Sequence, residues 1–496
     1  MEQGVSVSKA NPLPSTEGVA FAFLTVLLSV DAIVNASFGF SLPVFLATIV
    51  PSVMLSFLFP RAGLAASVSV TVLFERFFTL APIVLGEATY KLYPLDVVLL
   101  ASYSGMIATG LLHEGRRLRP RMSDLFLVAF FVLVTAIFLS DVATRSEGIA
   151  TAFSTWKNYV FYGSAYFAVA AATRSIPDLR AASRVFVGSV AVALTILVIG
   201  IVRGGGLWTE FTPLSTSGTR FLAFPHAFYY SLAFLVVMLG YSGSDTKASD
   251  RDPHGTDLAL LLFLGLGIVA SLMRHLWIGL GITLLSVAIF RLATDGRRIV
   301  SRLFRLAVPA VFVLSLVALL LSIAPSFVGD VDLSDAVSVI RERVISIGNT
   351  TDESLVWRDE VWHSAIARFA ERPVFGLGFG ASVPVEFGDY RQYVEVRNMH
   401  NSWLALLIQT GIVGGVIFAS FLGFLFFDLF RSASRSSVFL SAGRILTALA
   451  FFQGLVFFSQ PYLETNLLGI FFWITLGLIR SLPDMKAGPS KGVTTI

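Results

Sequence analysis

The tripeptide His400-Asn401-Ser402 stands where a long polar stretch gives way to an apolar run, and His400 is one of six histidines in the chain. An imidazole has an unperturbed pKa of about 6.5, so it can accept a proton from a hydroxyl group near neutral pH. Asn401 and Ser402 carry side-chain oxygens of the kind that cap the first turn of a helix. The pattern predicts general-base chemistry at the mouth of a helix. The structural alternative is a histidine satisfied by a backbone carbonyl.

Two arginines border apolar runs and are candidates for binding an anion. Arg220 stands just before a run that begins at Phe221, and Arg274 stands between two runs with almost no loop around it. A guanidinium is costly to place in a membrane and normally pairs or lines a polar cavity. Its planar fork binds phosphate oxygens through two parallel hydrogen bonds. The pair therefore favours a phosphate ligand, with snorkelling to lipid headgroups as the alternative.

Other residues near these motifs are expected to bind substrate or to support the site. We assign substrate binding to Arg358, His275 and Asn401, although a charged helix face in water accounts equally well for Arg358. Gly411 and Gly414 follow His400 in the same apolar run, where small residues let helices pack closely. We assign these two glycines a structural role that directs the histidine.

The sequence suggests no cofactor. The chain has no cysteine, which excludes a thiol nucleophile and a thiolate metal site. Asp330 and Asp332 form an acidic pair with no other ligand cluster nearby, so we assign no metal site. The glycine run at 376–380 follows no strand of a parallel sheet, which argues against dinucleotide binding.

The composition predicts a membrane protein that positions these residues on helices. The chain has 496 residues, of which 55% are hydrophobic and 14% are charged, whereas soluble domains carry about a quarter charged residues. We predict an all-α, polytopic integral membrane helical bundle of about 12–14 transmembrane helices, with one large extracytoplasmic loop containing short helices. The spans are predicted near 19–37, 41–59, 63–83, 94–113, 122–141, 158–173, 184–203, 221–242, 257–273, 276–293, 304–328, 403–430, 443–460 and 464–482.

The basic loops predict the orientation. The basic residues of alternate loops are Arg116, Arg117, Arg119, Arg121, Arg174, Arg180, Arg184, Lys247, Arg251, Arg297, Arg298, Arg302, Arg431, Arg435, Lys486 and Lys491. By the positive-inside rule these loops are cytoplasmic, as are both termini. We read the net charge of +4 as this topology signal and not as nucleic-acid affinity. The predicted parts are a tail at 1–18, a transmembrane bundle at 19–328, an extracytoplasmic loop at 329–401, C-terminal helices at 402–482 and a tail at 483–496.

The loop at 329–401 contains one predicted helix. Trp357, Val361, Ala365 and Phe369 recur at every fourth position, as on the apolar face of an amphipathic helix. This helix is expected to lie against the bundle or the membrane surface and to end by Pro373. The glycine run that follows predicts a tight turn.

With these motifs in place, the chain resembles the superfamily of O-antigen ligases and bacterial polysaccharide polymerases. The resemblance rests on His400-Asn401 followed by Gly411 and Gly414, and on the stretch from Trp357-Arg358 to Gly378. The segments around Arg220 and Arg274 are similar to the two arginine motifs of the family, although His226 and His275 stand where Asn and Gly are commoner. The resemblance covers roughly residues 210–430.

The resemblance implies a specific reaction. Members act at the outer face of the bacterial inner membrane on glycans linked to undecaprenyl pyrophosphate, and transfer the glycan to the hydroxyl of a saccharide, lipid or protein acceptor. They are inverting and need no metal. By this likeness Arg220 and Arg274 would hold the pyrophosphate leaving group, and His400 would activate the acceptor hydroxyl.

Two other function classes remain open. A secondary transporter or lipid-linked saccharide flippase would show internal repeats, broken helices paired across two halves and charges near mid-membrane. We see no repeat, and the candidate residues cluster on one face. A non-catalytic membrane scaffold would require neither the two arginines nor the histidine at the end of the loop.

Overall fold

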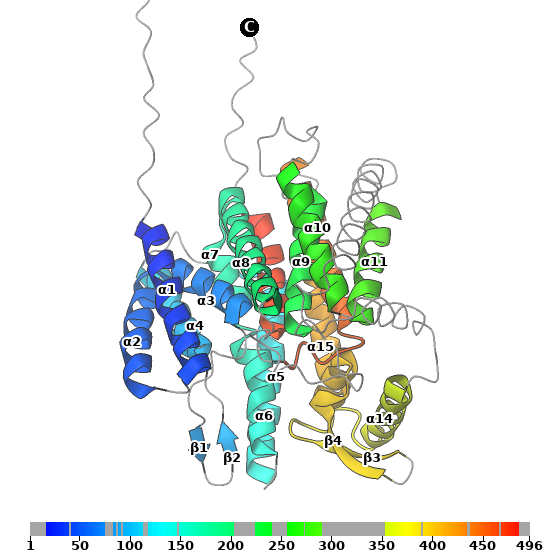
Figure 1. Cartoon of the computed structure of the whole chain (residues 1–496). Helices are drawn as coiled ribbons and strands as arrows, with labels where there is room; N and C mark the ends of the chain where they lie inside the picture. The colour runs from blue at the N-terminus through cyan, green and yellow to red at the C-terminus, as the bar shows by residue number, and fades with distance from the viewer. Residues whose placement is uncertain are drawn as a thin grey trace, which may run out of the picture. The chain divides into compact units, whose positions relative to one another are not determined.

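The computed structural model describes residues 16–38, 41–74, 83–85, 88–90, 93–112, 118–145, 148–202, 224–240, 255–271, 273–289, 353–387, 390–433, 437–465 and 468–485. These residues form two compact units (Figure 1). The predicted span at 304–328, the acidic pair Asp330 and Asp332, and Arg220 lie outside the described residues.

The first unit contains four helices from the N-terminal part of the chain. They are α1 (Thr16–Phe38), α2 (Leu42–Leu58), α3 (Pro60–Phe74) and α4 (Pro94–Leu112). Their shared core includes Leu24, Leu28, Val70 and Val98, all fully or almost fully buried. The buried hydroxyl of Ser67 donates a hydrogen bond to the carbonyl of Gly63 on its own helix, so this polar group is satisfied without water.

The second unit holds the remaining helices and the candidate site. Its elements between 118 and 289 are α5 (Met122–Thr144), α6 (Ile149–Trp156), the π-helical η3 (Lys157–Phe161), α7 (Ala165–Ala172), α8 (Ile176–Val202), α9 (Phe224–Gly240), α10 (Gly255–Ala270) and α11 (Arg274–Ile289). Those after 352 are α14 (Glu353–Phe369), β3 (Ser382–Phe387), β4 (Tyr390–Glu395), η6 (Val396–Asn398), α15 (Ser402–Ala433), α16 (Ser437–Val456), α17 (Gly469–Ser481) and η7 (Leu482–Asp484). A short pair, β1 (Ile83–Leu85) with β2 (Ala88–Tyr90), completes the described elements.

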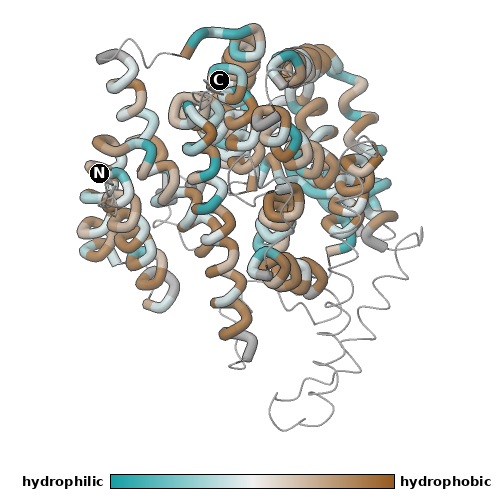
Figure 2. The backbone as a smooth tube through the Cα atoms, turned by 90° about the horizontal axis from the view of Figure 1, so that it is seen from above, coloured by the Kyte–Doolittle hydropathy of each residue, from teal (hydrophilic) through white to brown (hydrophobic). Residues whose placement is uncertain are grey.

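The helices confirm an all-α polytopic membrane protein. Among the described residues, five helices are long and apolar enough to cross a membrane, at Thr16–Val34, Met122–Thr144, Ile176–Ile199, Ser402–Ser432 and Phe439–Val456. Large apolar side chains are exposed along them, including Val132, Val416 and Phe427. Figure 2 shows hydrophobic residues along most of the helical tubes. This exposure is the expected property of helices whose outer faces contact lipid instead of water.

The predicted span at 158–173 is irregular at its start. Its chain passes from α6 through the π-helix η3 into α7, instead of following one regular helix. A π-helical turn adds one residue to a turn and often marks a functional site. Here it carries Asn158 and Tyr159, both buried, to the segment that joins α16 and α17.

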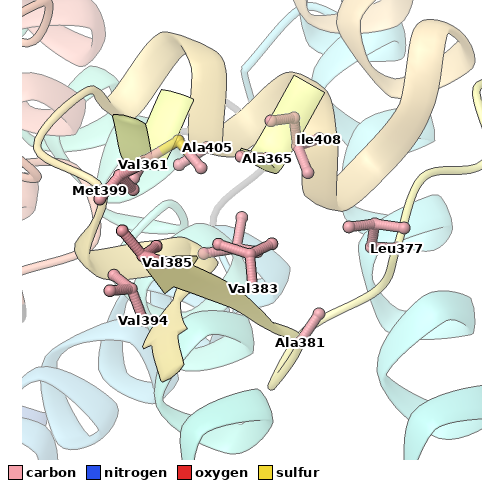
Figure 3. Close-up of a cluster of buried hydrophobic side chains, with 11 residues drawn as sticks. Val361, Ala365, Leu377, Ala381, Val383, Val385, Val394, Met399, Ala405 and Ile408 are labelled. Atoms are coloured by element: carbon pink, nitrogen blue, oxygen red, sulfur yellow. The ribbon is translucent and has the colours of Figure 1, made fainter. Parts of the chain in front are cut away.

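The predicted amphipathic helix is confirmed as α14, which packs on a two-stranded sheet. Strands β3 and β4 are antiparallel, with Val383 opposite Val394. Figure 3 shows Val361 and Ala365 of α14 close to Val383 and Val385 of the sheet. The hairpin was not expected from the sequence, which predicted only short helices in this loop. It gives α14 an apolar surface to cover, so the loop has a small core of its own.

The glycine segment (residues 376–380) fits into a break in α15. Gly411 has φ 73° and ψ −179°, which interrupts the helix. The carbonyls of Ile408 and Gln409 freed by the break accept hydrogen bonds from the N–H groups of Leu377 and Gly378, at 2.8 and 3.2 Å. The loop therefore satisfies backbone groups that a break inside a membrane helix would otherwise leave unpaired.

The same break is bonded on its other side. The N–H groups of Ile412 and Val413 donate to the carbonyls of Pro373 and Val374, at 2.9 and 3.2 Å. A Cβ atom at Gly411 would overlap the carbonyl of Val374, so only glycine fits this contact. Residues 373–378 and the part of α15 around Gly411 are thus joined by backbone hydrogen bonds on both sides of the break.

At the opposite end of α5 from the loop, a buried ion pair ties three helical elements together. Arg480 of α17 donates from Nε and Nη2 to the carboxylate of Asp124 in α5, at 2.8 Å for the closest contacts. The hydroxyl of Tyr166 in α7 donates to the same carboxylate at 2.9 Å. Arg480 is only 1% exposed, so the pair is sheltered from solvent.

Candidate functional site

His400 lies in a strained turn between η6 and α15. Among the residues that the structure describes, it is the one non-glycine residue with φ in the left-handed region, at 59°. An L-residue in this conformation is destabilised by about 1–2 kcal/mol. The turn is held from both sides, because its neighbours Met399 and Asn401 are buried. Strain of this kind persists where the surroundings determine the conformation, and it is common at functional sites.

Tryptophans from α14 hold this turn. The indole Nε1 of Trp362 donates a hydrogen bond to the carbonyl of Met399 at 2.8 Å. The ring of Trp357 meets the imidazole of His400 edge to face, with 5.5 Å between ring centroids and 89° between planes. The packing of α14 therefore fixes both the backbone before the histidine and the plane of its ring.

The surroundings of His400 keep its ring neutral. Burial lowers the pKa of the imidazole to about 4, and the nearby Arg358 guanidinium lowers it further, while a hydrogen bond with Gln460 raises it. Its Nδ1 atom is buried and has no hydrogen-bond partner among the described residues. A neutral imidazole can accept a proton, and an orphaned ring nitrogen is a place where a ligand or water completes the hydrogen bonding.

Asn401 caps α15, as its position in the sequence predicted. Its Oδ1 accepts a hydrogen bond from the N–H of Leu404 at 3.1 Å, and its carbonyl accepts one from Ala405 at 2.9 Å. Whether it also binds substrate stays a prediction. Ser402 does not cap the helix; its hydroxyl instead turns toward the segment between α16 and α17.

Arg274 and His275 occupy the first turn of α11. Arg274 is partly exposed, and the Nε2 atom of His275 lies 2.8 Å from the hydroxyl of Tyr462. The ring of Tyr462 also packs against Phe228 of α9, with 5.1 Å between centroids. The N-terminus of a helix favours anions because its N–H groups are unpaired and its dipole is positive there. The position is therefore suitable for a phosphate-binding arginine.

A buried carboxylate lies beside the start of α15. Glu464, in the connection between α16 and α17, is 1% exposed. Its carboxylate accepts hydrogen bonds from the hydroxyls of Ser402 and, at 2.8 Å, Tyr159. Burial raises the pKa of Glu464 to about 7, although these bonds and the Arg397 guanidinium act in the opposite direction. Perturbed titratable groups of this kind gather at functional sites.

The geometry thus unites several of the predicted residues. Arg358 of α14 lies near His400, and Asn401 follows His400 in the chain. His275 is joined to this group through the segment that carries Tyr462 and Glu464. Within the described ranges, no three His, Asp or Glu side chains are grouped so as to hold a metal ion. The arrangement can accept a proton at His400 and offer positive charge at Arg358 and Arg274.

Residues 259–419 match the family model described as O-antigen ligase. The chain carries a domain of the O-antigen ligase family. No curated protein matches the chain.

The O-antigen ligase region includes most of the candidate site. It extends from α10 through α14 and the hairpin into the first half of α15, and so contains Arg274, Arg358, His400 and Gly411. The family assignment confirms the resemblance seen in the sequence. The protein is accordingly a membrane enzyme of glycan processing, of the O-antigen ligase or polymerase type.

Sequence reasoning missed Glu464, Tyr462 and Arg397. Arg397 donates from Nη2 to the carbonyl of Glu464 at 3.1 Å and so links the residues before His400 to the same segment. One signal could have found Glu464. It is an acidic residue at the predicted start of a membrane span, where an ionisable group calls for a partner.

Proposed function

We propose that this protein is an inverting, metal-independent glycosyltransferase that moves a glycan from undecaprenyl pyrophosphate to an acceptor hydroxyl. His400 is the general base, and Arg274 and Arg220 bind the pyrophosphate. The observation that carries the proposal is the neutral His400, held in a strained turn beside Arg358 within the region that matches the O-antigen ligase family.

In the proposed reaction, the acceptor hydroxyl displaces undecaprenyl pyrophosphate from the glycan. The acceptor oxygen attacks the anomeric carbon from the face opposite the pyrophosphate, and His400 takes the hydroxyl proton. The bond between the anomeric carbon and the pyrophosphate oxygen breaks, and the electron pair leaves with undecaprenyl pyrophosphate. The guanidinium groups stabilise charge that grows on the leaving group, so they favour the transition state over the ground state. One face of the sugar is attacked while the other is vacated, which inverts the anomeric configuration.

We place the reaction at the outer face of the bacterial inner membrane, with both chain termini in the cytoplasm. The support is the distribution of basic loops and the position of His400 at the end of the long loop. A polyprenyl tail stays in lipid while its pyrophosphate head reaches the helix ends. The acceptor is a second saccharide chain in a polymerase, or a lipid or protein in a ligase. We favour the polymerase role because nothing in the loop suggests a site for a lipid A core.

The proposal is tested by glycan transfer in reconstituted vesicles that contain undecaprenyl-pyrophosphate-linked oligosaccharide extracted from the host's membranes. His400→Ala, Arg220→Ala and Arg274→Ala should each lower the rate by about two to three orders of magnitude, without added metal. Matched controls are His363→Ala and Arg391→Ala, because both side chains are exposed, at 75% and 63%. The product itself separates polymerase from ligase.

Three outcomes would contradict the proposal. Full activity of the His400 variant would remove the base, and dependence on a divalent cation would remove the metal-free mechanism. Movement of the intact lipid-linked donor across the bilayer without glycan transfer would instead support a flippase or transporter.

A further inference from the structure

Two candidate motifs lie at the starts of different helices, yet one short segment contacts both. Arg274 and His275 begin α11, whereas Asn401 and Ser402 begin α15. The bridging segment, residues 457–465, follows α16 and leads toward α17. Because the reaction needs the base and the leaving-group arginine at a set separation, an element that bonds both helix starts controls that separation.

One set of contacts of the bridging segment, which we call its first arm, holds the start of α15 through Phe457, Leu463 and Glu464. The N–H of Ser402 donates to the carbonyl of Phe457 at 2.8 Å, and the N–H of Leu463 donates to the hydroxyl of Ser402 at 3.1 Å. The same hydroxyl donates to the carboxylate of Glu464. Ser402 is fully buried and only two residues from His400, so these bonds determine where the turn of His400 lies.

The second arm of the bridging segment is Tyr462, which contacts the start of α11. The hydroxyl of Tyr462 lies 2.8 Å from Nε2 of His275, which is next to Arg274 in the chain. Tyr462 is 1% exposed, and its ring rests on Phe228 of α9. Only one residue separates Tyr462 from Glu464, so a shift at one arm moves the other.

The desolvation of Glu464 destabilises the fold, so stability alone does not explain a glutamate in this position. Its carboxylate is buried against Tyr159 of η3 and Ser402 of α15, and Arg397 of η6 is the charged group that faces it. Replacing a buried charged group by an apolar one is often neutral or stabilising. The π-helical turn is an irregular element that contacts the same residue. It carries Asn158 and Tyr159, and Asn158 donates a hydrogen bond to the Glu464 carbonyl.

We propose that Glu464 and Tyr462 are positioning residues for glycan transfer, Glu464 through the turn of His400 and Tyr462 through the first turn of α11. This inference rests on the proposed function. It predicts different kinetic effects at the two arms, because one acts on the base and the other on the group that binds the donor. A purely structural pair would affect both parameters through the amount of folded protein.

The test compares Glu464→Gln, Tyr462→Phe and Thr475→Val in the reconstituted transfer assay, at matched amounts of folded protein. Thr475→Val is the control. It removes a buried hydrogen bond between Gln453 of α16 and Thr475 of α17, and this bond involves neither the start of α11 nor the start of α15. Binding of sugar-free undecaprenyl pyrophosphate is measured in parallel. Glu464→Gln should lower kcat by about 10–100-fold and leave binding within about twofold, because the base is displaced.

Tyr462→Phe should weaken binding of undecaprenyl pyrophosphate by about 3–10-fold, because it removes the hydrogen bond to His275, which adjoins Arg274. The change in kcat should be smaller. Thr475→Val should change neither parameter. If Glu464→Gln does not fold, Ser402→Ala and Tyr159→Phe remove its two hydroxyl partners singly, and each should lower kcat in the same sense.

Two results would overturn the inference. One is a Glu464 or Ser402 variant with the kcat of the Thr475 control, and the other is a Tyr462 variant that binds undecaprenyl pyrophosphate as tightly as that control. The variant His400→Ala is measured in the same assay, so that a failure of this inference can be distinguished from a failure of the proposed function. If His400→Ala is inactive while the positioning variants behave like Thr475→Val, only the inference fails; if His400→Ala is fully active, the proposed function fails.

Discussion

At the scale of single residues, the proposed chemistry depends on two side chains whose pKa values burial shifts in opposite directions. Burial favours the neutral form of any ionisable group, so it lowers the pKa of His400 to about 4 and raises that of Glu464 to about 7. Near neutral pH the histidine is therefore ready to accept a proton. The glutamate is close to its titration point, so its charge depends on small changes of pH.

The pH dependence of the transfer reaction tests the role of His400. Because its neutral form persists down to about pH 4 in the free protein, kcat/KM should be lost only as pH falls through that value, and not near the usual 6.5. Arg358→Gln removes one of the two causes of the low pKa, so the acid limb should move upward. The measurement is the profile of kcat/KM from acid to neutral pH. An acid limb in the same place for both proteins would show that Arg358 does not act on the base.

The stability of the protein should depend on pH through the titration of Glu464. Its pKa is raised from a usual 4.5 to about 7 in the fold, so the folded state binds more protons than the unfolded state between these values. This contribution to stability is fully present below the lower value and is lost as pH rises through the higher one. Glu464→Gln should flatten the fall of Tm between these pH values in detergent. An unchanged slope in the variant would mean that another group titrates there.

At the scale of elements, the break in α15 is the feature that joins the long loop to the helix that follows His400. The helix is interrupted at Gly411, and the residues around Val374 and Gly378 provide the hydrogen bonds that the interruption frees. A broken helix is tolerated within a membrane protein only where other protein groups satisfy its backbone. The glycine is needed both for its positive φ and for the close approach of Val374.

A pair of glycine substitutions in the same helix isolates this effect. Gly411→Ala should destabilise the protein by about 2–5 kcal/mol, from backbone strain and overlap with Val374. Gly423→Ala should be neutral or stabilising by up to about 1 kcal/mol, because open space surrounds that position in regular helix. Thermal unfolding in detergent compares the two. Equal effects would argue against a special backbone role for Gly411.

The ion pair between Asp124 and Arg480 supports the far end of the same bundle. Asp124→Ala leaves a buried guanidinium without its partner and should cost about 3–5 kcal/mol. Glu386→Ala breaks an exposed pair with Arg391 on the hairpin, where the exposed fractions are 70% and 63%, and should cost less than about 1 kcal/mol. Unfolding curves of the two variants provide the comparison. A small cost at Asp124 would show that Asp484, the other carboxylate bound by Arg480, is a sufficient partner.

At the scale of the whole molecule, the testable property is its orientation in the membrane. The chain has no cysteine, so each introduced cysteine is the single reactive thiol. We expect Tyr393→Cys, in β4, to react with an impermeant maleimide in intact spheroplasts, since Tyr393 is 70% exposed. Glu17→Cys, at the start of α1, should react only after the membrane is opened. Labelling in the opposite order would invert the proposed topology.

The amino-acid sequence was sufficient to predict the class of the protein and to single out its candidate reactive groups. Apolar runs of membrane-spanning length predicted most helices within a few residues, because this signal is summed over many positions and needs no tertiary information. His400 and Arg274 could be singled out because a histidine or an arginine at the boundary of such a run is unusual and chemically specific. Arg220 has the same kind of signal and lies outside the described residues.

The contacts that hold these groups in place could be seen only in the folded chain. The hairpin of β3 and β4 depends on the pairing of two short strands whose apolar residues find their partner in α14, and such contacts leave a weak local pattern. The break at Gly411 becomes visible only when the chain at 373–378 supplies its hydrogen bonds. Glu464 and Ser402 are 62 residues apart, and Glu464 and Tyr159 are 305 apart. Their hydrogen bonds exist because helices distant in the sequence pack together, and no local spacing encodes that contact.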